Sequence, residues 1–529
     1  MATPDILRIF TYNKKIKVMK KLYEYQQEAV DATDKHDKGI VVMPTGTGKT
    51  FIQASILIND IKNNPGFRIY VINAPRIMLS IQLLKETFEY NIDAKIDARY
   101  MAVHSGKLGE LKELQEYRKK HTDFDPALIP STTSTIEIKD MVEKAKSENQ
   151  PLIFLSTYNS TIRIQDALDE NIINIALNDE AHYLTQERFN NDFNKMDIER
   201  KYFFTATTKE TPSSEGLGMN NSDFYGNRIH VMTPLQAINL GKMVRPKVHY
   251  VSPSDKLMSQ DELDKNLGRV VMDSFNKHSD LLKNGLKGKM LIAASGTKDM
   301  KKLIGDDLLL DFINGGGKFY AVASDKDVDN YINGRIVSRV EWLKQLQIDG
   351  SNPNQEMIVI HYDILTEGID VPGLTGVLFL RNLKKSKFIQ TFGRVARLNT
   401  LDRKLIDDKI ITPNDLDKMN KPYAWIILPA LKREDDDKVA NLEYLIEELR
   451  DYGFDPKEDI EPNDRGNGNS EVENNDIVPI DNSLGRNIAK AIENYEHVIE
   501  DERVSSLTWE EIVQEQVESG RNNDTTFDY

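Results

Sequence analysis

The 529-residue chain contains no cysteine, and this absence excludes several kinds of site. Disulfide bonds, iron–sulfur clusters and zinc sites with thiolate ligands all require cysteine sulfur. The chain also lacks an apolar run of the roughly 18 residues that a membrane-spanning helix needs. Its first residues have neither a basic cap nor an apolar stretch, so the sequence indicates no secretory signal. We therefore expect a protein without a membrane segment, in a cytoplasmic setting.

The net charge of −15 is concentrated at one end of the chain. Residues 455–529 hold 20 acidic side chains and 6 lysines or arginines, a net of −14, which leaves the rest of the chain at −1. A balanced body is compatible with binding to a polyanion, because the local distribution of charge decides such binding. The segment at about 455–483 is rich in Asp, Glu, Asn, Gly and Pro, and this composition predicts a disordered linker.

Short apolar, β-branched runs alternate with helical segments over most of the chain. Such runs are typical of buried parallel strands, so the alternation predicts an α/β fold in which helices flank parallel sheets. In the first half the runs are Ile40–Met43, Ile69–Ile72, Tyr100–Val103, Leu152–Leu155, Ile172–Leu177 and Tyr202–Phe204. A second series follows at Met290–Ala293, Phe319–Ala323, Met357–Ile360, Val377–Leu380 and Ala424–Leu428.

These two series predict two α/β domains. We expect the first at 22–235, with a helical insertion at about 108–150, and the second at 236–435. A basic lead-in would occupy 1–21, and C-terminal helices with the acidic linker would occupy 436–529. The stretch Lys209–Lys247 contains several glycines and prolines, and we interpret it as a loop that crosses between the domains.

Met43-Pro-Thr-Gly-Thr-Gly-Lys-Thr50 stands between a predicted strand and an amphipathic helix, where a phosphate-binding loop belongs. Gly46 and Gly48 let the backbone curl so that its amides and the helix N-terminus point at phosphate oxygens. Lys49 supplies a charge to the β- and γ-phosphates, and Thr50 offers a hydroxyl to Mg2+. A glycine turn without function is the alternative. The cofactors predicted from this motif are ATP and Mg2+, bound by Thr45, Gly46, Thr47, Gly48, Lys49 and Thr50.

Asp179-Glu180-Ala181-His182 follows the apolar run that ends at Leu177. A carboxylate at a strand end beside a phosphate loop can hold Mg2+, and a second carboxylate can orient the attacking water. We assign Asp179 to the metal and Glu180 to the water. His182 either couples the nucleotide to the second domain or caps the helix that follows.

Gln390-Thr-Phe-Gly-Arg394-Val-Ala-Arg397 lies on a predicted helix of the second domain. The three-residue step places the guanidiniums of Arg394 and Arg397 on one face. Arginine suits the spread charge of a transferring phosphoryl group, so these two residues are candidates for a catalytic trigger supplied across a cleft. A solvated basic face is the alternative.

With these motifs in this order, the chain resembles superfamily 2 helicases of the DEAH/DExH kind, especially the motor modules of restriction-type (type I and type III-like) and phage-type DNA helicases. The resemblance covers roughly residues 20–435 and implies two tandem RecA-like domains. Two departures are visible: Met43 stands where the general pattern has glycine, and Thr208 where many relatives have proline. Neither removes a catalytic side chain, so the resemblance implies an active ATPase.

The resemblance assigns roles to further residues. Gln26 would read adenine, and the other nucleotide contacts would be Gly368, Asp370 and Gln390. Coupling of hydrolysis to domain movement would involve His182, Thr205, Ala206 and Thr207. Contacts with nucleic acid would come from Arg76 and Gln82, from Thr157 in the motif Phe154–Tyr158, from Ser295, and from Thr366 in the motif Thr366–Pro372.

The sequence thus predicts an ATP-dependent helicase or translocase that acts on DNA, with RNA left open. One alternative is a duplex-DNA translocase of a restriction or defence complex that does not separate strands. Another is a non-motor protein in which ATP gates nucleic-acid binding or annealing. The acidic tail would dock a basic protein partner, lie in the chain's own nucleic-acid groove, or only aid solubility. Two basic clusters would add grip on nucleic acid or form solvated faces: Lys14, Lys15, Lys17, Lys20 and Lys21, and Arg381, Lys384, Lys385 and Lys387.

Overall fold

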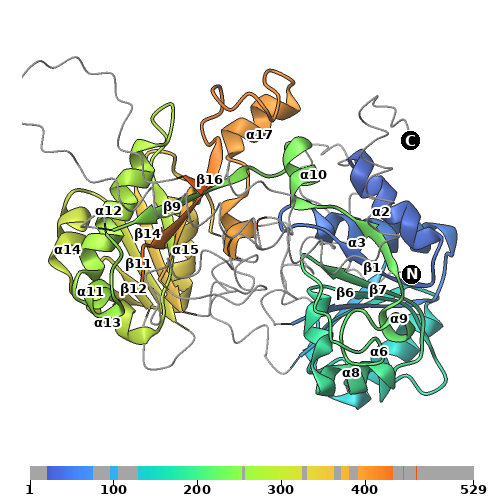
Figure 1. Ribbon diagram of the computed structural model, residues 1–529. Helices are drawn as coiled ribbons and strands as arrows, with labels where there is room; N and C mark the ends of the chain where they lie inside the picture. The colour runs from blue at the N-terminus through green and yellow to red at the C-terminus, as the bar shows by residue number, and fades with distance from the viewer. Residues whose placement is uncertain are drawn as a thin grey trace, which may run out of the picture.

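Two sheets, each flanked by helices, make up the protein, as the sequence predicts (Figure 1). The computed structural model describes residues 21–75, 96–104, 129–252, 256–323, 330–362, 371–380 and 391–432, together with Leu445, Leu449, Ile460 and Glu461. The tandem α/β architecture is therefore confirmed. Much of the lead-in, the insertion and the acidic tail lies outside the described residues.

The first sheet has eight strands in the order β4-β3-β5-β2-β6-β7-β1-β8, and every pair in it is parallel. Each predicted apolar run of the first half falls on one of these strands. The strands are β1 (Lys38–Val42), β2 (Ile69–Ala74), β3 (Arg99–Val103), β4 (Ser131–Thr132), β5 (Leu152–Thr157), β6 (Ile173–Asn178), β7 (Ile198–Thr205) and β8 (Arg228–Val231).

Helices cover both faces of this sheet, and alternate side chains of each strand serve the two faces. In β2, Tyr70 and Ile72 join the core on one face, while Ile69 and Val71 join the core on the other. This is why the strand is apolar throughout, and burying each such side chain contributes about 1.5–3 kcal/mol. The helices of this part are α2 (Glu24–Asp34), α3 (Lys49–Asn63), α6 (Thr135–Ser147), α7 (Ile162–Gln165), α8 (Glu187–Asn194), α9 (Ser222–Tyr225), α10 (Pro234–Asn239) and the 3-10 helix η3 (Ala181–Thr185).

The second sheet has nine strands in the order β13-β12-β11-β14-β10-β15-β16-β9-β17. It is parallel except for an antiparallel ladder that joins β11, β12 and β13 at one edge. Its strands are β9 (Arg245–Val251), β10 (Lys289–Ala293), β11 (Lys318–Ala323), β12 (Asn330–Ile332), β13 (Arg335–Val337), β14 (Met357–Tyr362), β15 (Gly376–Phe379), β16 (Tyr423–Pro429) and β17 (Ile460–Glu461). Its helices are α11 (Gln260–Lys265), α12 (Leu267–Asp280), α13 (Thr297–Ile304), α14 (Asp307–Asn314), α15 (Arg339–Ser351) and α17 (Thr400–Asp407).

The interpretation of Lys209–Lys247 as a loop was wrong in part. The stretch contains α9, strand β8, helix α10 and the first residues of β9. Strand β8 pairs with β1 at the sheet edge, and all four of its residues keep some exposure, so it lacks the apolar signature of the buried strands. The crossing between the sheets is confined to the segment from Met232 to Val244, in which a capping box at Thr233 begins α10.

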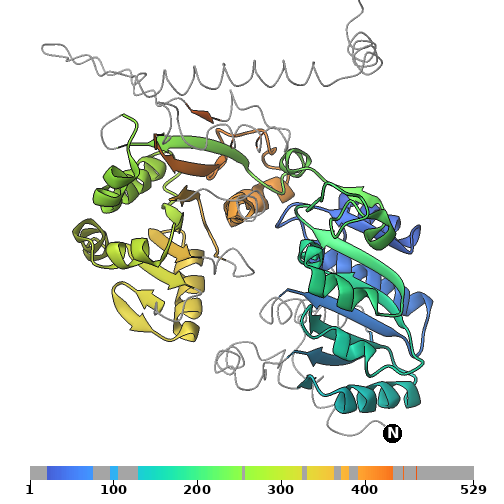
Figure 2. The same cartoon turned by 60° about the horizontal axis from the view of Figure 1, so that its bottom comes forward.

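The apolar cores of the two sheets are continuous. Met243, in the crossing segment, and Phe392 and Val395, in the second domain, belong to the same cluster of buried side chains as the α2 and α3 face of the first sheet. Figure 2 shows the crossing segment with α10 between the two parts of the molecule. No helix among the described residues is both long and apolar enough to span a membrane.

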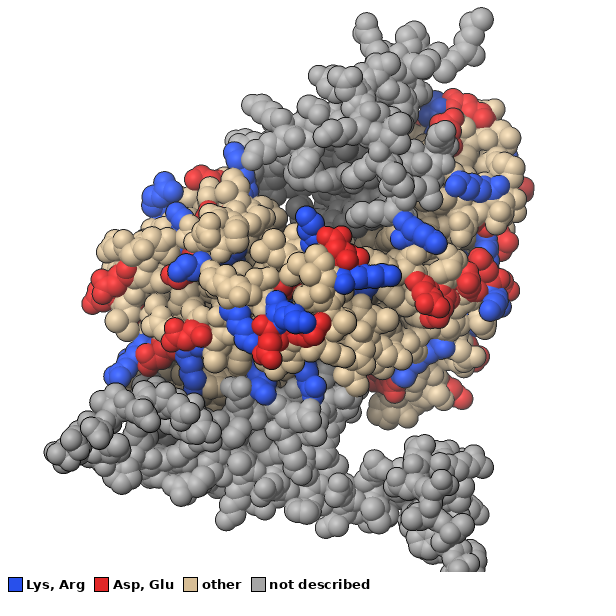
Figure 3. Space-filling model, turned by 90° about the horizontal axis from the view of Figure 1, so that it is seen from above, with Lys and Arg blue, Asp and Glu red and all other residues tan. Residues whose placement is uncertain are grey.

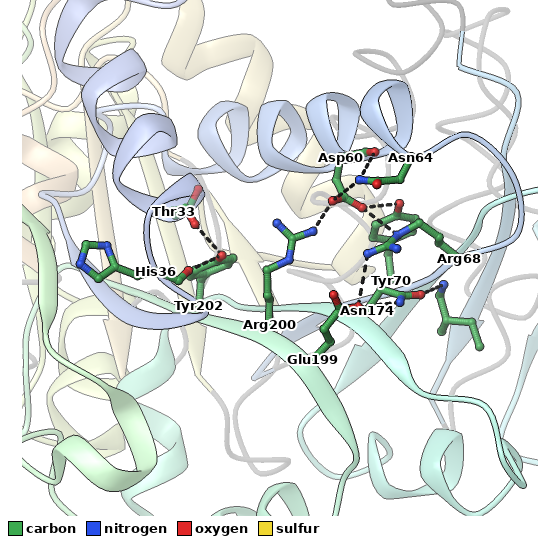
Figure 4. A network of polar contacts seen from close by, with 11 residues as sticks. Thr33, His36, Asp60, Asn64, Arg68, Tyr70, Asn174, Glu199, Arg200 and Tyr202 are labelled. Carbon is green, nitrogen blue, oxygen red and sulfur yellow. Dashed lines mark hydrogen bonds and ion pairs between the residues drawn. The ribbon is translucent and has the colours of Figure 1, made fainter.

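A polar network ties α3 to the amino ends of β2 and β7 (Figure 4). The carboxylate of Asp60, nearly buried, accepts hydrogen bonds from Arg68 Nε at 3.0 Å and the Tyr70 hydroxyl at 2.7 Å, and Arg200 also donates to it. A buried carboxylate is stable only when paired in this way. The network lies at the end of the sheet opposite the glycine-rich loop that precedes α3.

Candidate nucleotide-binding site

The glycine-rich loop lies at the carboxyl end of β1 and runs into α3, whose first residue is Lys49. Gly46 and Gly48 have φ values of +89° and +91°, a left-handed conformation that strongly favours glycine. Lys49 is buried, and its Nζ donates to the carbonyl oxygens of Met43 at 3.1 Å and Pro44 at 3.4 Å. The ammonium thus lies over a loop whose curled backbone and helix N-terminus suit a phosphate chain.

Gln26 is buried against this loop. Its Nε2 donates to the carbonyl oxygen of Thr47 at 3.0 Å, and its Oε1 accepts from the backbone N–H of Tyr23 at 3.0 Å. The hydroxyl of Tyr25 donates to the same Thr47 oxygen at 2.9 Å. A Cβ on Gly48 would lie 2.4 Å from Gln26 Nε2, so this contact also depends on the glycine. The structure places Gln26 where it supports the loop, and its role in reading adenine stays a prediction.

Asp179 and Glu180 follow β6 directly, next to α3. Gln53, one turn after Lys49 on α3, donates from Nε2 to Asp179 Oδ1 at 3.0 Å. Burial and the neighbouring Glu180 raise the pKa of Asp179 to about 7, while Lys49 and the Gln53 hydrogen bond oppose the rise. Glu180 itself has a left-handed backbone, with φ of +48°.

The side-chain oxygen atoms of this site are suitable ligands for a magnesium ion. Thr50 and Asp179 are the residues that would hold it, and a cation there would offset the charge that Asp179 and Glu180 concentrate in a buried place. When bound, the ion would supply Lewis-acid stabilisation of phosphate oxygens.

Tyr158 packs next to the acidic residues and supports Asp179 through a hydrogen bond. Its side chain is fully buried, and its hydroxyl donates to the carbonyl oxygen of Asp179 at 2.7 Å. Tyr158 ends the segment Phe154–Tyr158 that the resemblance assigns to nucleic-acid contact. The motif predicted to contact nucleic acid is therefore hydrogen-bonded to Asp179, which is predicted to hold the metal. No sequence motif predicts the hydrogen bonds that Tyr158 and Gln53 make to Asp179.

His182 lies inside η3, and its ring contacts strand β7. Nδ1 lies 3.2 Å from Thr205 Oγ1 and 3.5 Å from Glu180 Oε2. Since the Thr205 hydroxyl donates its hydrogen to the carbonyl oxygen of Thr207 at 2.7 Å, the His182 Nδ1 must carry the proton that Thr205 accepts. Burial, with Lys209 and Lys49, lowers the pKa of His182 to about 3, so the ring is neutral. The contacts join Glu180 to the Thr205-Ala206-Thr207 segment.

The arginine motif of the second domain lies against the loop of the first. Residues 391–395 are helical, and Gly393 is buried against Thr45: a Cβ on this glycine would lie 3.1 Å from Thr45 Cβ. A Cβ on Gly46 would lie 3.5 Å from Arg397 Cγ and 3.9 Å from Arg397 Nε. Arg394, from the same helical turn, is half-buried. Residues more than 340 positions apart thus meet at one place.

A second contact joins the two domains nearby. The ammonium of Lys242, in the crossing segment, lies 3.4 Å from the ring centroid of Tyr23 and 3.7 Å from Asp407 Oδ1. The Tyr23 hydroxyl also donates to this carboxylate at 3.4 Å. The lead-in to α2 is therefore linked to α17 through a cation–π contact and an ion pair.

The predicted nucleic-acid contacts fall in different settings. Thr157 is buried, and its hydroxyl donates to Ser160 Oγ at 3.3 Å. Ser295 is exposed and bonds to the Asp299 carboxylate beside a cavity of about 750 Å³. That cavity lies at the carboxyl ends of β10, β14, β15 and β16. Outside the described residues lie Arg76, Gln82, Thr366, Gly368, Asp370 and Gln390, with both basic clusters except Lys21.

Comparisons with known proteins agree with this arrangement. Residues 19–210 match the family model described as "Type III restriction enzyme, res subunit". The chain also aligns with the ATP-dependent Type ISP restriction-modification enzyme LlaBIII bound to DNA, at 21% identity and a TM-score of 0.57, over 82% of this chain and 30% of that one. Residues 19–210 are therefore similar to that restriction-enzyme subunit, and the chain has a fold similar to that of LlaBIII.

Further similar structures cover the same region. A nuclease-deletion mutant of the Type ISP enzyme LlaGI aligns at 20% identity and a TM-score of 0.46, over 82% of this chain and 29% of that one. A DEAD box protein from the hyperthermophile Methanococcus jannaschii aligns at 16% identity and a TM-score of 0.40, over 86% and 96%. The chain thus spans about 30% of the length of the restriction enzymes that it matches. A comparison with curated proteins gave no match.

Proposed function

We propose that this chain is an ATP-driven motor that moves along nucleic acid, with DNA as its track. The observation that carries the proposal is the contact of Gly393 and Arg397, from the second domain, with Thr45 and Gly46 of the phosphate loop. A nucleotide that binds at this loop would lie between two domains, so a change in the nucleotide would change the distance between them.

The chemistry is divided between the two domains. Lys49 and the loop amides would bind the phosphates, and Glu180 would orient the attacking water. Arg397, with Arg394, would approach the γ-phosphate from the second domain and stabilise the charge that develops there. An arginine supplied in this way typically accelerates phosphoryl transfer by about 10³–10⁵-fold. Hydrolysis would then require the closed arrangement of the domains.

Movement along the track follows from the same division. His182 bonds to Thr205 and lies near Glu180, so a rearrangement of the carboxylate on hydrolysis would reach the segment that ends β7. Tyr158 links Asp179 to the strand-end segment Phe154–Tyr158 on the first domain, and Ser295 stands at the strand ends of the second. Opening and closing would shift these two groups of contacts relative to each other.

Contacts of this type involve phosphates and sugars and carry no sequence code. On the face shown in Figure 3, basic and acidic side chains alternate over the described surface. Binding would therefore depend on a few placed groups at the strand ends and would weaken with salt. We favour DNA over RNA because the restriction enzyme LlaBIII, which this chain matches with a TM-score of 0.57, is bound to DNA.

The deciding experiment compares ATP turnover with no polynucleotide, single-stranded DNA, duplex DNA, branched DNA and RNA. We expect stimulation by DNA and its loss in the Lys49→Ala variant. Turnover that no polynucleotide changes would sink the proposal of a motor. Stimulation by RNA alone would mean that the protein is a motor that moves along RNA instead of DNA.

Two assays separate unwinding from duplex tracking, the second candidate function. Strand displacement reports unwinding, whereas displacement of a triplex-forming strand reports movement along an intact duplex. The restriction-type match of residues 19–210 favours keeping duplex tracking as a candidate. Triplex displacement without strand displacement would establish it.

A further inference from the structure

Lys421 is a buried lysine whose ammonium bonds only to backbone oxygens in the contacts that the structure shows. It is 2% exposed, and its Nζ donates to the carbonyl oxygens of Leu374 and Arg397, each at 2.7 Å, and to that of Val395. A buried ammonium is costly unless its three hydrogens are all bonded. Here each hydrogen has an acceptor.

The three acceptors come from two segments of the second domain. Val395 and Arg397 lie in the arginine motif, on either side of the point where its helix ends. Leu374 follows the motif Thr366–Pro372 by two residues, before β15 begins. Because a helix leaves its last carbonyls without intrahelical donors, a cation at this end is electrostatically favourable. One ammonium therefore joins the end of the arginine helix to the segment behind it.

Asp402 holds Lys421 in place from α17. Its carboxylate is completely buried and accepts from the backbone N–H of Asn420 at 2.8 Å, from Asn420 Nδ2 at 2.7 Å and from the backbone N–H of Lys421 at 2.9 Å. The base of the Lys421 side chain is thus as firmly fixed as its tip. Burial lowers the pKa of Lys421 to about 7, with Arg397 adding to the fall and Asp402 opposing it.

On the other side, the crossing segment completes the support of this motif. The backbone N–H of Val244 donates to the carbonyl oxygen of Ala396 at 2.8 Å, and Met243 forms an isolated antiparallel bridge with Arg397. Arg397 is therefore held at its backbone by Lys421 and by the crossing segment, while its side chain lies beside Gly46.

We propose that Lys421 is a positioning residue for Arg397, fixing the backbone from which this arginine reaches the phosphate loop. The inference rests on the proposed function. Lys421 does not touch the nucleotide site itself, so its loss should lower the rate of hydrolysis and leave nucleotide binding nearly unchanged. A displacement of about 1 Å in a catalytic group can cost about 100-fold in rate.

The chain offers a matched control in Lys289. This lysine is also 2% exposed, lies in the same domain, and donates from Nζ to the carbonyl oxygens of Gly350 at 2.6 Å and Asn352 at 2.7 Å. Burial lowers its pKa to about 8. Its acceptors end α15, which has no part in the arginine motif. Lys289→Met therefore reproduces the loss of a buried ammonium without touching Arg397.

The test measures DNA-stimulated ATP hydrolysis and the affinity for a fluorescent ADP analogue in wild type, Lys421→Met and Lys289→Met. We expect kcat to fall by about tenfold or more in Lys421→Met, with KM and the ADP affinity within about twofold of wild type. Lys289→Met should lower the thermal unfolding midpoint and keep kcat. Equal falls in kcat for both lysine variants would overturn the proposal, because they would indicate a general loss of structure.

A double-mutant cycle distinguishes positioning from an independent effect. If Lys421 acts through Arg397, then Lys421→Met should cost almost nothing further in an Arg397→Ala background. Additive losses would overturn the proposal. Should Lys421→Met fail to fold, Asp402→Asn keeps the ammonium and loosens its anchor, and a kcat equal to that of wild type would then count against it.

The outcome is separable from that for the proposed function. Hydrolysis by wild type that DNA stimulates, together with full kcat in Lys421→Met, would overturn this inference alone. Wild type that hydrolyses no ATP would overturn both.

Discussion

Gly393 packs against Thr45 so closely that a single added carbon would lie 3.1 Å from the threonine Cβ and 3.2 Å from its hydroxyl oxygen. The two residues stand on different domains, one in the arginine motif and the other in the phosphate loop. In the same interface, Arg397 lies beside Gly46. A side chain at position 393 would therefore force one of the two segments to shift by a few tenths of an ångström.

Gly393→Val should hold the two segments apart and slow hydrolysis. We expect kcat to fall by about tenfold or more, because a shift of about 1 Å between catalytic groups has effects of this size or larger. Nucleotide affinity should change less, since Lys49 and the loop are intact. The measurement is steady-state ATP turnover with saturating DNA.

Gly305→Ala is the control for this substitution. Gly305 has open space where a Cβ would be, and its φ of −107° suits any residue. Its kcat should equal that of wild type. If Gly393→Val also kept full kcat, the contact with Thr45 would not govern closure.

Tyr158→Phe should weaken the link between the Phe154–Tyr158 segment and Asp179. A buried hydrogen bond of 2.7 Å is lost, and such bonds contribute about 1 kcal/mol, or about fivefold in rate where the group positions a catalytic residue. We expect a reduced kcat and a smaller stimulation by DNA, measured as the ratio of turnover with and without it.

The matched control is Tyr250→Phe. The Tyr250 hydroxyl is buried in the second domain and has no hydrogen-bond partner among the described residues. Removing it should be neutral or stabilising and should leave turnover unchanged. Stimulation by DNA that is the same in Tyr158→Phe and wild type would contradict the proposed link.

Asp60→Asn should destabilise the first domain without changing the chemistry. The substitution leaves Arg68 and Arg200 beside a neutral group and weakens the bond from the Tyr70 hydroxyl. Breaking a buried ion pair costs about 3–5 kcal/mol, so we expect a clearly lower midpoint in urea unfolding. Turnover per folded molecule should persist, because this network lies at the far end of the sheet from Lys49.

Glu199→Gln tests whether Asp60→Asn lowers stability because the Asp60 carboxylate is buried. Glu199 bonds to the same Arg68 at 3.3 Å, but its side chain is 44% exposed. Exposed pairs contribute under about 1 kcal/mol, so this variant should unfold near the wild-type midpoint. Similar midpoints for Asp60→Asn and Glu199→Gln would refute the argument.

The burial of His278 should make the stability of the fold depend on pH. Burial, with Lys421 nearby, lowers the pKa of His278 from 6.5 to about 3. The folded state therefore holds the ring neutral, and this contribution is complete above pH 6.5 and is lost as the pH falls toward 3. His278→Gln should flatten the fall in thermal midpoint over this window. Parallel curves of thermal midpoint against pH for wild type and His278→Gln would show that another group controls this pH dependence.

The sequence alone determined the alternation of strands and helices and the position of the chemistry on it. Parallel strands buried on both faces need continuous apolar runs, and every run that was predicted is a strand. The phosphate loop and the Asp179–His182 segment could be located because each directly follows such a run. These signals are local, because each can be recognised from a short stretch of consecutive residues.

Tertiary structure decided the features that depend on distant partners. Strand β8 was missed because its side chains are partly exposed and form no apolar run. Its pairing with β1 holds it in the sheet. Gln26 bonds to Thr47, and Lys421 to Val395 and Arg397, through side chains whose acceptors are backbone oxygens. A backbone oxygen has the same identity in every residue, so no motif marks it. Only the folding of each domain brings these groups, which are 21 to 26 positions apart, next to one another.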